Sequence, residues 1–224
     1  MTGQGAFAFT WYPEPFESHA TLAYAVPDAE LGAAQLLLQS SRSTTSGGEL
    51  SGQSLGYAWG RRVAPQLSAG VQLRWDVQQA TIQGLPSPQE AGLGLDAGLL
   101  YDAAPGLWLE AAVLDAFDTR LRSSSGTTIL VKQRLFAGVT RQLRPDLALS
   151  FAGRDLTTDL NGATWSFGGR LERAGWIFTG EAGLGPHFTW SLAARMPRGR
   201  WSLRAVAEGT EAKAGCGLGV DVRW

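Results

Sequence analysis

The sequence predicts an all-β fold, a single antiparallel transmembrane β-barrel of about fourteen strands that occupies residues 1–224. Three observations predict it. Apolar residues recur at every second position through most of the chain, which is the period of a β-strand. No segment holds the eighteen or so consecutive apolar residues of a membrane-spanning helix, so a membrane protein of this sequence must be a closed barrel. Long and short connections alternate, as expected for short periplasmic turns and longer external loops.

Each strand is predicted from its alternation and from the residues that end it. The first strand places Phe7, Phe9 and Trp11 on one face, and Pro13 ends it because proline cannot donate to a ladder. The third has no clear face, since three leucines in a row at 36–38 serve both sides. The fifth is the most regular, with apolar residues at every odd position from 67 to 77. The predicted strands cover residues 5–12, 17–26, 30–41, 53–61, 67–78, 92–102, 107–116, 131–141, 147–155, 164–172, 175–184, 187–196, 201–209 and 214–224.

The connections between these strands divide into two kinds. Residues 41–50, rich in Ser, Thr and Gly, and the polar residues 118–128 are predicted as long external loops, together with 83–90 and 156–163. Short returns are predicted at 27–28, 62–65, 103–106 and 143–146. An even number of strands places both chain ends on the periplasmic side.

Composition excludes several functions. The 19 basic and 20 acidic residues nearly cancel, so no nucleic acid partner is expected. The only cysteine, Cys216, cannot form an internal disulfide or a Cys-based zinc site. His19 and His187 have no companion at metal-ligand spacing, and Ser191 near His187 lacks an orienting third group. The sequence therefore predicts a non-enzymatic protein with no catalytic residue, cofactor or metal.

If the apolar faces meet lipid, the opposite faces line a lumen. A charge at the lipid-exposed midplane would cost roughly 2–4 kcal/mol for Arg or Lys, which excludes the reversed assignment. Opposite charges two residues apart, as in Arg74 and Asp76, Arg170 and Glu172, and Asp221 and Arg223, predict mutually neutralising pairs and a structural rather than a selective lumen. The predicted lumen-lining charges are Arg74, Asp76, Asp96, Arg154, Arg170, Glu172, Arg195, Arg204, Glu208, Asp221 and Arg223. Tryptophans near strand ends, at 11, 59, 165, 176, 201 and 224, predict aromatic girdles at the membrane interfaces.

The C-terminal stretch 214–224 alternates small or charged residues with apolar ones and ends on an aromatic residue. It resembles the last strand of bacterial outer-membrane β-barrels, in which such residues form the signal for the barrel-assembly machinery. The resemblance assigns this role to Leu218, Val220, Val222 and Trp224 and implies an outer-membrane location. The N-terminus has no charged segment followed by an apolar core and a cleavage site, so the chain is expected to be a signal-less or N-terminally truncated form.

The segment 94–109, which runs Gly-Leu-Asp-Ala-Gly-Leu-Leu-Tyr-Asp-Ala-Ala-Pro-Gly-Leu-Trp-Leu, resembles the PorV/PorQ group of the FadL-like outer-membrane barrels. The second strand departs from that family, since it reads Leu114-Asp115-Ala116 where Asn-Leu-Gly is usual, and the family's N-terminal Asn-Pro-Ala-Gly segment is missing. The resemblance implies passive transport of small or hydrophobic molecules. The alternatives are an accessory or surface-anchoring component of a protein secretion system, acting through 41–50 and 118–128, and a soluble ligand-binding all-β protein. Expected partners are outer-membrane lipid, the assembly machinery, and a small hydrophobic ligand or secretion-system proteins.

Overall fold

The computed structural model describes residues 4–12, 17–28, 32–45, 48–82, 85–123, 126, 128–156, 163–211 and 214–223. They form seventeen β-strands in one sheet, and no helix among them is long and apolar enough to cross a membrane. The strands are β1 (Gln4–Tyr12), β2 (Glu17–Asp28), β3 (Gly32–Thr45), β4 (Gly48–Ala64), β5 (Leu67–Ile82), β6 (Leu85–Pro86), β7 (Glu90–Ala104), β8 (Leu107–Leu114), β9 (Thr119–Ser123), β10 (Thr128–Val131), β11 (Arg134–Arg144), β12 (Leu147–Arg154), β13 (Thr164–Arg173), β14 (Trp176–Leu184), β15 (Thr189–Arg198), β16 (Trp201–Thr210) and β17 (Ala214–Arg223). The predicted all-β antiparallel fold is confirmed.

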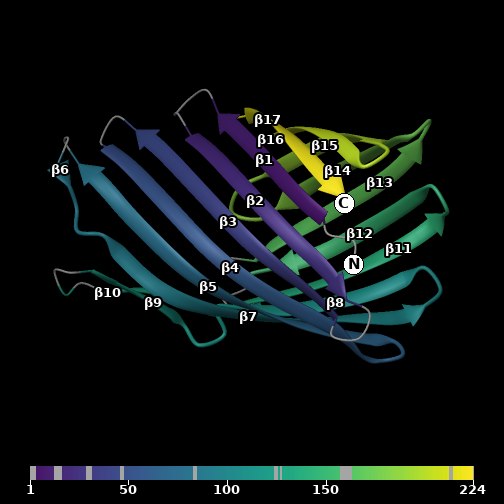
Figure 1. The fold of residues 1–224 in the computed structure, drawn as a ribbon, viewed down its shortest axis with the longest axis horizontal. Helices are drawn as coiled ribbons and strands as arrows, with labels where there is room; N and C mark the ends of the chain where they lie inside the picture. The colour runs from purple at the N-terminus through teal and green to yellow at the C-terminus, as the bar shows by residue number, and fades with distance from the viewer. Residues whose placement is uncertain are drawn as a thin grey trace.

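Strand pairing follows the chain and returns to its start. Each strand from β1 to β5 pairs with the next, β5 pairs with β7, β7 with β8, β8 with β11, and β11 to β17 pair in succession. β17 then pairs with β1 from Gln4↔Arg223 to Trp11↔Cys216. Figure 1 shows β1 lying between β2 and β17. Setting aside the short strands β6, β9 and β10, the fourteen strands of this ring correspond one to one with the fourteen predicted ones.

One end of the ring has tight turns. Two residues connect the strands at 65–66, 105–106, 145–146, 174–175 and 199–200. At 174–175 both residues have positive φ, 52° for Ala174 and 79° for Gly175, which is the turn that matches the twist of a two-residue hairpin. We call this the short-turn end, and the opposite one the long-loop end. The predicted return at 27–28 is wrong, because Pro27 and Asp28 still pair with Ala33 and Gly32 as part of β2 and β3.

Two predicted external loops are largely strand. Within 41–50, β3 continues to Thr45 and β4 begins at Gly48, with Ser43↔Leu50 and Thr44↔Glu49 among the rungs. Within 118–128 lies β9, which pairs with β10 as a hairpin. The predicted loop 83–90 contains β6 and the first residue of β7. These corrections share a reason: a hairpin that continues past the membrane can be polar on both faces, so its ladder leaves no apolar alternation in the sequence.

The distribution of apolar side chains is the reverse of that in a soluble sandwich. Among the described residues the only buried hydrophobic ones are Leu121 and Ala163. Large apolar side chains are instead exposed on every ring strand from β2 to β17, for example Leu73 at 52%, Leu192 at 60% and Leu218 at 72%. The soluble alternative does not fit this distribution, since burial of apolar surface is what stabilises a water-soluble fold.

The sequence did not show which side of β3 faces outward, and the pairing register with β4 now shows it. Leu36 and Leu38 are exposed and pair with the outward Tyr57 and Leu55. Leu37 lies on the other face, against the position of Gly56. β3 therefore continues the alternation of its neighbours.

Candidate functional site in the lumen

The inner face of the ring carries small and charged side chains. Along β5, Leu73 and Trp75 are exposed on the outer face, and the intervening Arg74 and Asp76 side chains are only 18% and 20% exposed. The same contrast occurs on β16, where the outward Leu203 is 54% exposed and the neighbouring Ser202 is 4% exposed. The inner face therefore holds the polar groups, and many of them pair with one another, as expected for groups removed from water.

Arg74 is the centre of one inner cluster. Its guanidinium donates to Asp76 at 3.0 Å, to Asp115 at 2.7 Å and to Asp96 at 3.4 Å. Asp115 is fully buried, and it also accepts a 2.7 Å hydrogen bond from the Thr119 hydroxyl. The predicted pair of Arg74 and Asp76 is present, and it belongs to a larger network that brings β5, β7 and the β8–β9 connection together. We call Arg74, Asp76, Asp96, Asp115 and Thr119 the Arg74 cluster.

The cluster lies where the wall of the ring is interrupted. β7 pairs with β8 from Ala97 to Ala104 and with β9 at Glu90 and Ala91, so β9 continues the line of β8 along the same edge of β7. Between them the backbone has positive φ at Asp115 and Asp118, and the Asp115 N–H donates to the Asp96 carboxylate at 2.9 Å. The bend directs the Asp115 side chain inward. Through Asp115 and Thr119, the start of the β9–β10 hairpin is bonded to Arg74 on the inner face of β5.

A second inner cluster joins three strands of the C-terminal half. Arg195 of β15 donates to the Ser202 hydroxyl at 2.8 Å and contacts Asp221 of β17 at 2.9 Å. Ser202 in turn donates to Asp221 at 2.9 Å. Asp221 contacts Arg195 because β15 and β17 flank β16 and their inner residues meet over it. The predicted pair of Asp221 with Arg223 stays a prediction, since the Arg223 side chain lies outside the described residues.

The other predicted lumen charges are placed separately. Arg154 contacts Glu181 at 3.4 Å across β13, and Arg170 pairs with Glu172 as predicted. Arg204 and Glu208 lie on the inner face of β16, in the alternation set by Ser202. Arg223 belongs to β17 by its backbone, and its side chain lies outside the described residues. The predicted charges therefore form several local pairs rather than one site.

Sequence reasoning missed several inner residues. The sequence placed Asp115 near the end of a strand, Thr119 in a loop and Arg134 in a strand without a role. In the structure Arg134 contacts Asp115 at 3.5 Å and Asp155 at 3.9 Å. Glu110 and Glu181 also lie inside. The signal that could have found Glu110 and Glu181 is their position on the small-residue side of their strands.

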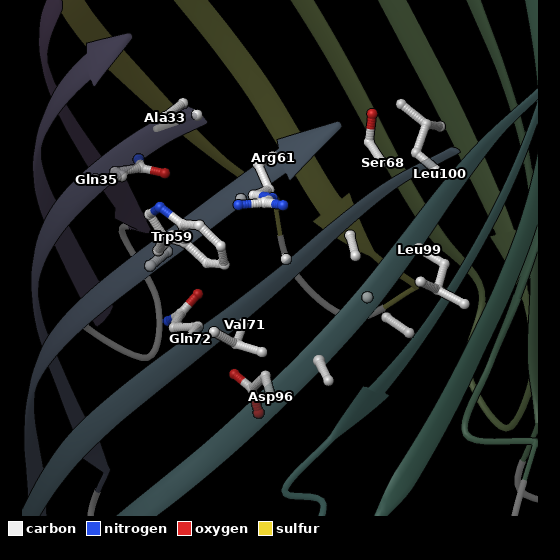
Figure 2. Close-up of a pocket in the computed structure, with 18 of the residues that line it drawn as sticks. Ala33, Gln35, Trp59, Arg61, Ser68, Val71, Gln72, Asp96, Leu99 and Leu100 are labelled. Atoms are coloured by element: carbon white, nitrogen blue, oxygen red, sulfur yellow. The ribbon is translucent and has the colours of Figure 1, made fainter. Parts of the chain in front are cut away.

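Two open hollows are described along the inner faces at the short-turn end. The larger measures about 780 Å³ and is lined by β3, β4, β5, β7, β8 and β11. Figure 2 shows Gln35, Gln72 and Asp96 around it, with Arg61 beside Trp59. Its other lining residues are mostly alanine and glycine, with Leu114 and Phe136. The smaller hollow, about 550 Å³, is lined by Arg170, Glu172, Glu181 and their neighbours.

The residues assigned to the C-terminal assembly signal share the outer face of β17 as far as they are described. Leu218 is exposed, and Val220 and Val222 are half-buried in the same alternation. Trp224 lies outside the described residues. Of the predicted girdle tryptophans, Trp59, Trp165, Trp176 and Trp201 are 37–58% exposed, and the side chain of Trp11 is not among those described.

No protein-family model matches the sequence, and comparison with curated proteins finds no match. Solved structures do match. The toluene transporter TodX of Pseudomonas putida aligns with a TM-score of 0.72 and 8% identity over 99% of this chain and 88% of that one. The CymD monoaromatic hydrocarbon channel aligns at 0.68 with 10% identity over 99% and 86%, and the toluene transporter TbuX of Ralstonia pickettii at 0.58 with 10% identity over 99% and 87%. At such identities the similarity shows the fold alone, an antiparallel β-barrel.

Proposed function

We propose that this protein is a non-enzymatic outer-membrane channel that passes small, largely apolar molecules by diffusion. The observation that supports it best is the inside-out ring: apolar side chains cover the outer face, and polar and small ones surround hollows on the inner face. An outer surface of this kind is stable in lipid, and the pairing of β17 with β1 joins the first and last strands of the sheet, as a strand wall in lipid requires. The similarity to the toluene transporters TodX and TbuX and to the monoaromatic hydrocarbon channel CymD favours the same class of substrate.

The proposed cargo also fits the wall of the larger hollow. Alanine, glycine, Leu114 and Phe136 give it a mainly apolar lining, and two of its charged residues, Asp96 and Arg62, are paired with Arg74 and Asp102. A lining of this kind desolvates an apolar molecule at little cost, since few polar groups lose water.

Conductance of the purified protein in a planar bilayer tests the proposal. We expect discrete conductance steps that fall when a small aromatic molecule such as toluene is added. Ala58→Trp, which places a large ring in the larger hollow, should reduce the steps, and Leu192→Trp on the outer face of β15 should not. A correctly folded barrel that conducts nothing would contradict an open channel.

Such a silent barrel would favour the second candidate, an accessory or surface-anchoring component of a secretion system. The observation in its favour is that the two segments predicted to meet a partner, 41–50 and 118–128, carry the β3–β4 and β9–β10 hairpins and so present ordered strands at the long-loop end. The resemblance to the PorV/PorQ group remains a prediction.

A further inference from the structure

One carboxylate of the larger hollow has no counter-charge. Asp96 is bonded to Arg74, Arg62 pairs with Asp102 at 3.3 Å, and the Arg61 guanidinium lies 6.0 Å from the centre of the Trp59 ring. The remaining ionised group of the lining is Glu110 of β8. Among the residues that the structure describes, nothing donates a hydrogen bond to its side chain or forms an ion pair with it.

The place of Glu110 in the wall is defined by its two neighbours in register, Leu100 of β7 and Gly138 of β11. The Glu110 side chain lies across Gly138, since a Cβ at that glycine would come within 2.6 Å of Glu110 Oε1 and 2.9 Å of its Cγ. The carboxylate is half-buried and borders the hollow instead of extending freely into water.

Its surroundings offer little compensation for lost hydration. Leu100, Ala112, Leu114 and Phe136 line the same hollow. A partly desolvated carboxylate among apolar groups attracts a cation or a charged N–H donor, because a charge-assisted hydrogen bond replaces the lost water.

Acidic side chains also outnumber basic ones in this part of the lumen. Around the β8–β9 connection, two guanidiniums, Arg74 and Arg134, contact four carboxylates, those of Asp76, Asp96, Asp115 and Asp155. Glu110 of β8 adds a fifth carboxylate on this side of the lumen. In the C-terminal half, Arg154, Arg170 and Arg195 each have one acidic partner. The potential on the Glu110 side of the lumen therefore favours positive ligands.

We propose that the larger hollow binds amphipathic amines, molecules with a compact apolar body and one protonated nitrogen, and that Glu110 accepts the hydrogen bond from that nitrogen. The hollow, at about 780 Å³, has room for a single-ring aromatic amine. Gln35 and Gln72 supply neutral polar contacts on the facing strands. The proposal rests on the proposed function only in that the lumen must admit the ligand.

Equilibrium binding to the refolded protein in nanodiscs tests it, with empty nanodiscs subtracted. The probes are 4-phenylbutylamine, 4-phenylbutanol and 4-phenylbutyrate, which share an apolar body and differ in charge. We expect the amine to bind at least tenfold more tightly than the alcohol, and the acid most weakly. Glu110→Gln, which keeps the size of the side chain, should remove the preference for the amine and leave the affinity for the alcohol unchanged.

Glu181→Gln is the matched control, because Glu181 is also an inner carboxylate but is paired with Arg154. It should retain the amine preference. Equal affinity of the wild-type protein for amine and alcohol, or an unchanged preference in Glu110→Gln, would overturn the proposal. These outcomes are separate from failure of the proposed function, which a folded protein without conductance would show whatever it binds.

Discussion

Arg74 on β5 donates a 2.7 Å hydrogen bond to Asp115, a residue 41 positions along the chain that is fully buried at the break between β8 and β9. This contact closes the wall of the ring at the point where regular pairing with β7 stops. Through one guanidinium it links β5, β7 and the connection that leads into the β9–β10 hairpin.

Loss of that guanidinium should destabilise the barrel strongly. Arg74→Met removes the guanidinium that contacts three inner carboxylates, and removing one member of a buried charged network costs about 3–5 kcal/mol. We expect this decrease in the free energy of unfolding in a urea titration of the refolded protein. Arg144→Met is the control, since its pair with Asp146 is exposed and should contribute less than about 1 kcal/mol. Equal stability of the two variants would show that the Arg74 cluster is not structural.

Two adjacent residues of β15 test which face meets lipid. Leu192 is 60% exposed, and Ser191 pairs in register with Glu181 and Glu208 on the inner face. Leu192→Arg should lower the stability in vesicles by about 2–4 kcal/mol, because it places a charge in the hydrocarbon layer. Ser191→Arg should cost far less, since two carboxylates flank it. The reverse order would mean that the faces are misassigned.

The docking of the β9–β10 hairpin on β7 should depend on Gly92. A Cβ at this position would come within 2.4 Å of the backbone oxygen of Arg120, so Gly92→Ala must push β9 away. We expect faster trypsin cleavage after Arg120 and Arg122, measured by mass spectrometry of timed digests. Gly169→Ala, where the nearest atom to the new Cβ is 3.5 Å away, should digest as the wild-type protein does.

Closure of the ring should depend on β17. Deletion of residues 222–224 removes Val222 and Arg223, which pair with Gly5 and Gln4, together with the proposed assembly residue Trp224. We expect the full chain to show a heat-dependent mobility shift on a denaturing gel after refolding in detergent, and the deletion variant to show none. A full chain that folds without detergent and shows no shift would contradict a membrane barrel.

The strands could be predicted because lipid outside and polar groups inside impose a period of two. On β5, Leu73 and Trp75 alternate with Arg74 and Asp76, and the observed faces agree. The partners of inner charges could be predicted only where both lie on one strand, as for Arg170 and Glu172. Arg195 and Asp221 meet because β16 lies between their strands, which one sequence does not state.

Asp115 was missed for a different reason. It continues the pattern of β8 in the sequence, and only the positive φ of its backbone directs the side chain inward. Glu110 was missed because the absence of a basic partner near its carboxylate depends on which strands lie beside β8, and the sequence alone does not show this.

The wall of the barrel is uneven in height. β3, β4 and β5 have 14, 17 and 16 residues, whereas β12 has 8. A tilted strand needs about 9–11 residues to cross the hydrocarbon core, so the β3–β4–β5 wall rises roughly 15–20 Å beyond it. Because backbone pairing supports this projecting part of the wall, we expect its polar side chains to tolerate substitution. A peptide epitope inserted between Thr45 and Gly48 would be displayed well clear of the lipid surface, on a rigid support.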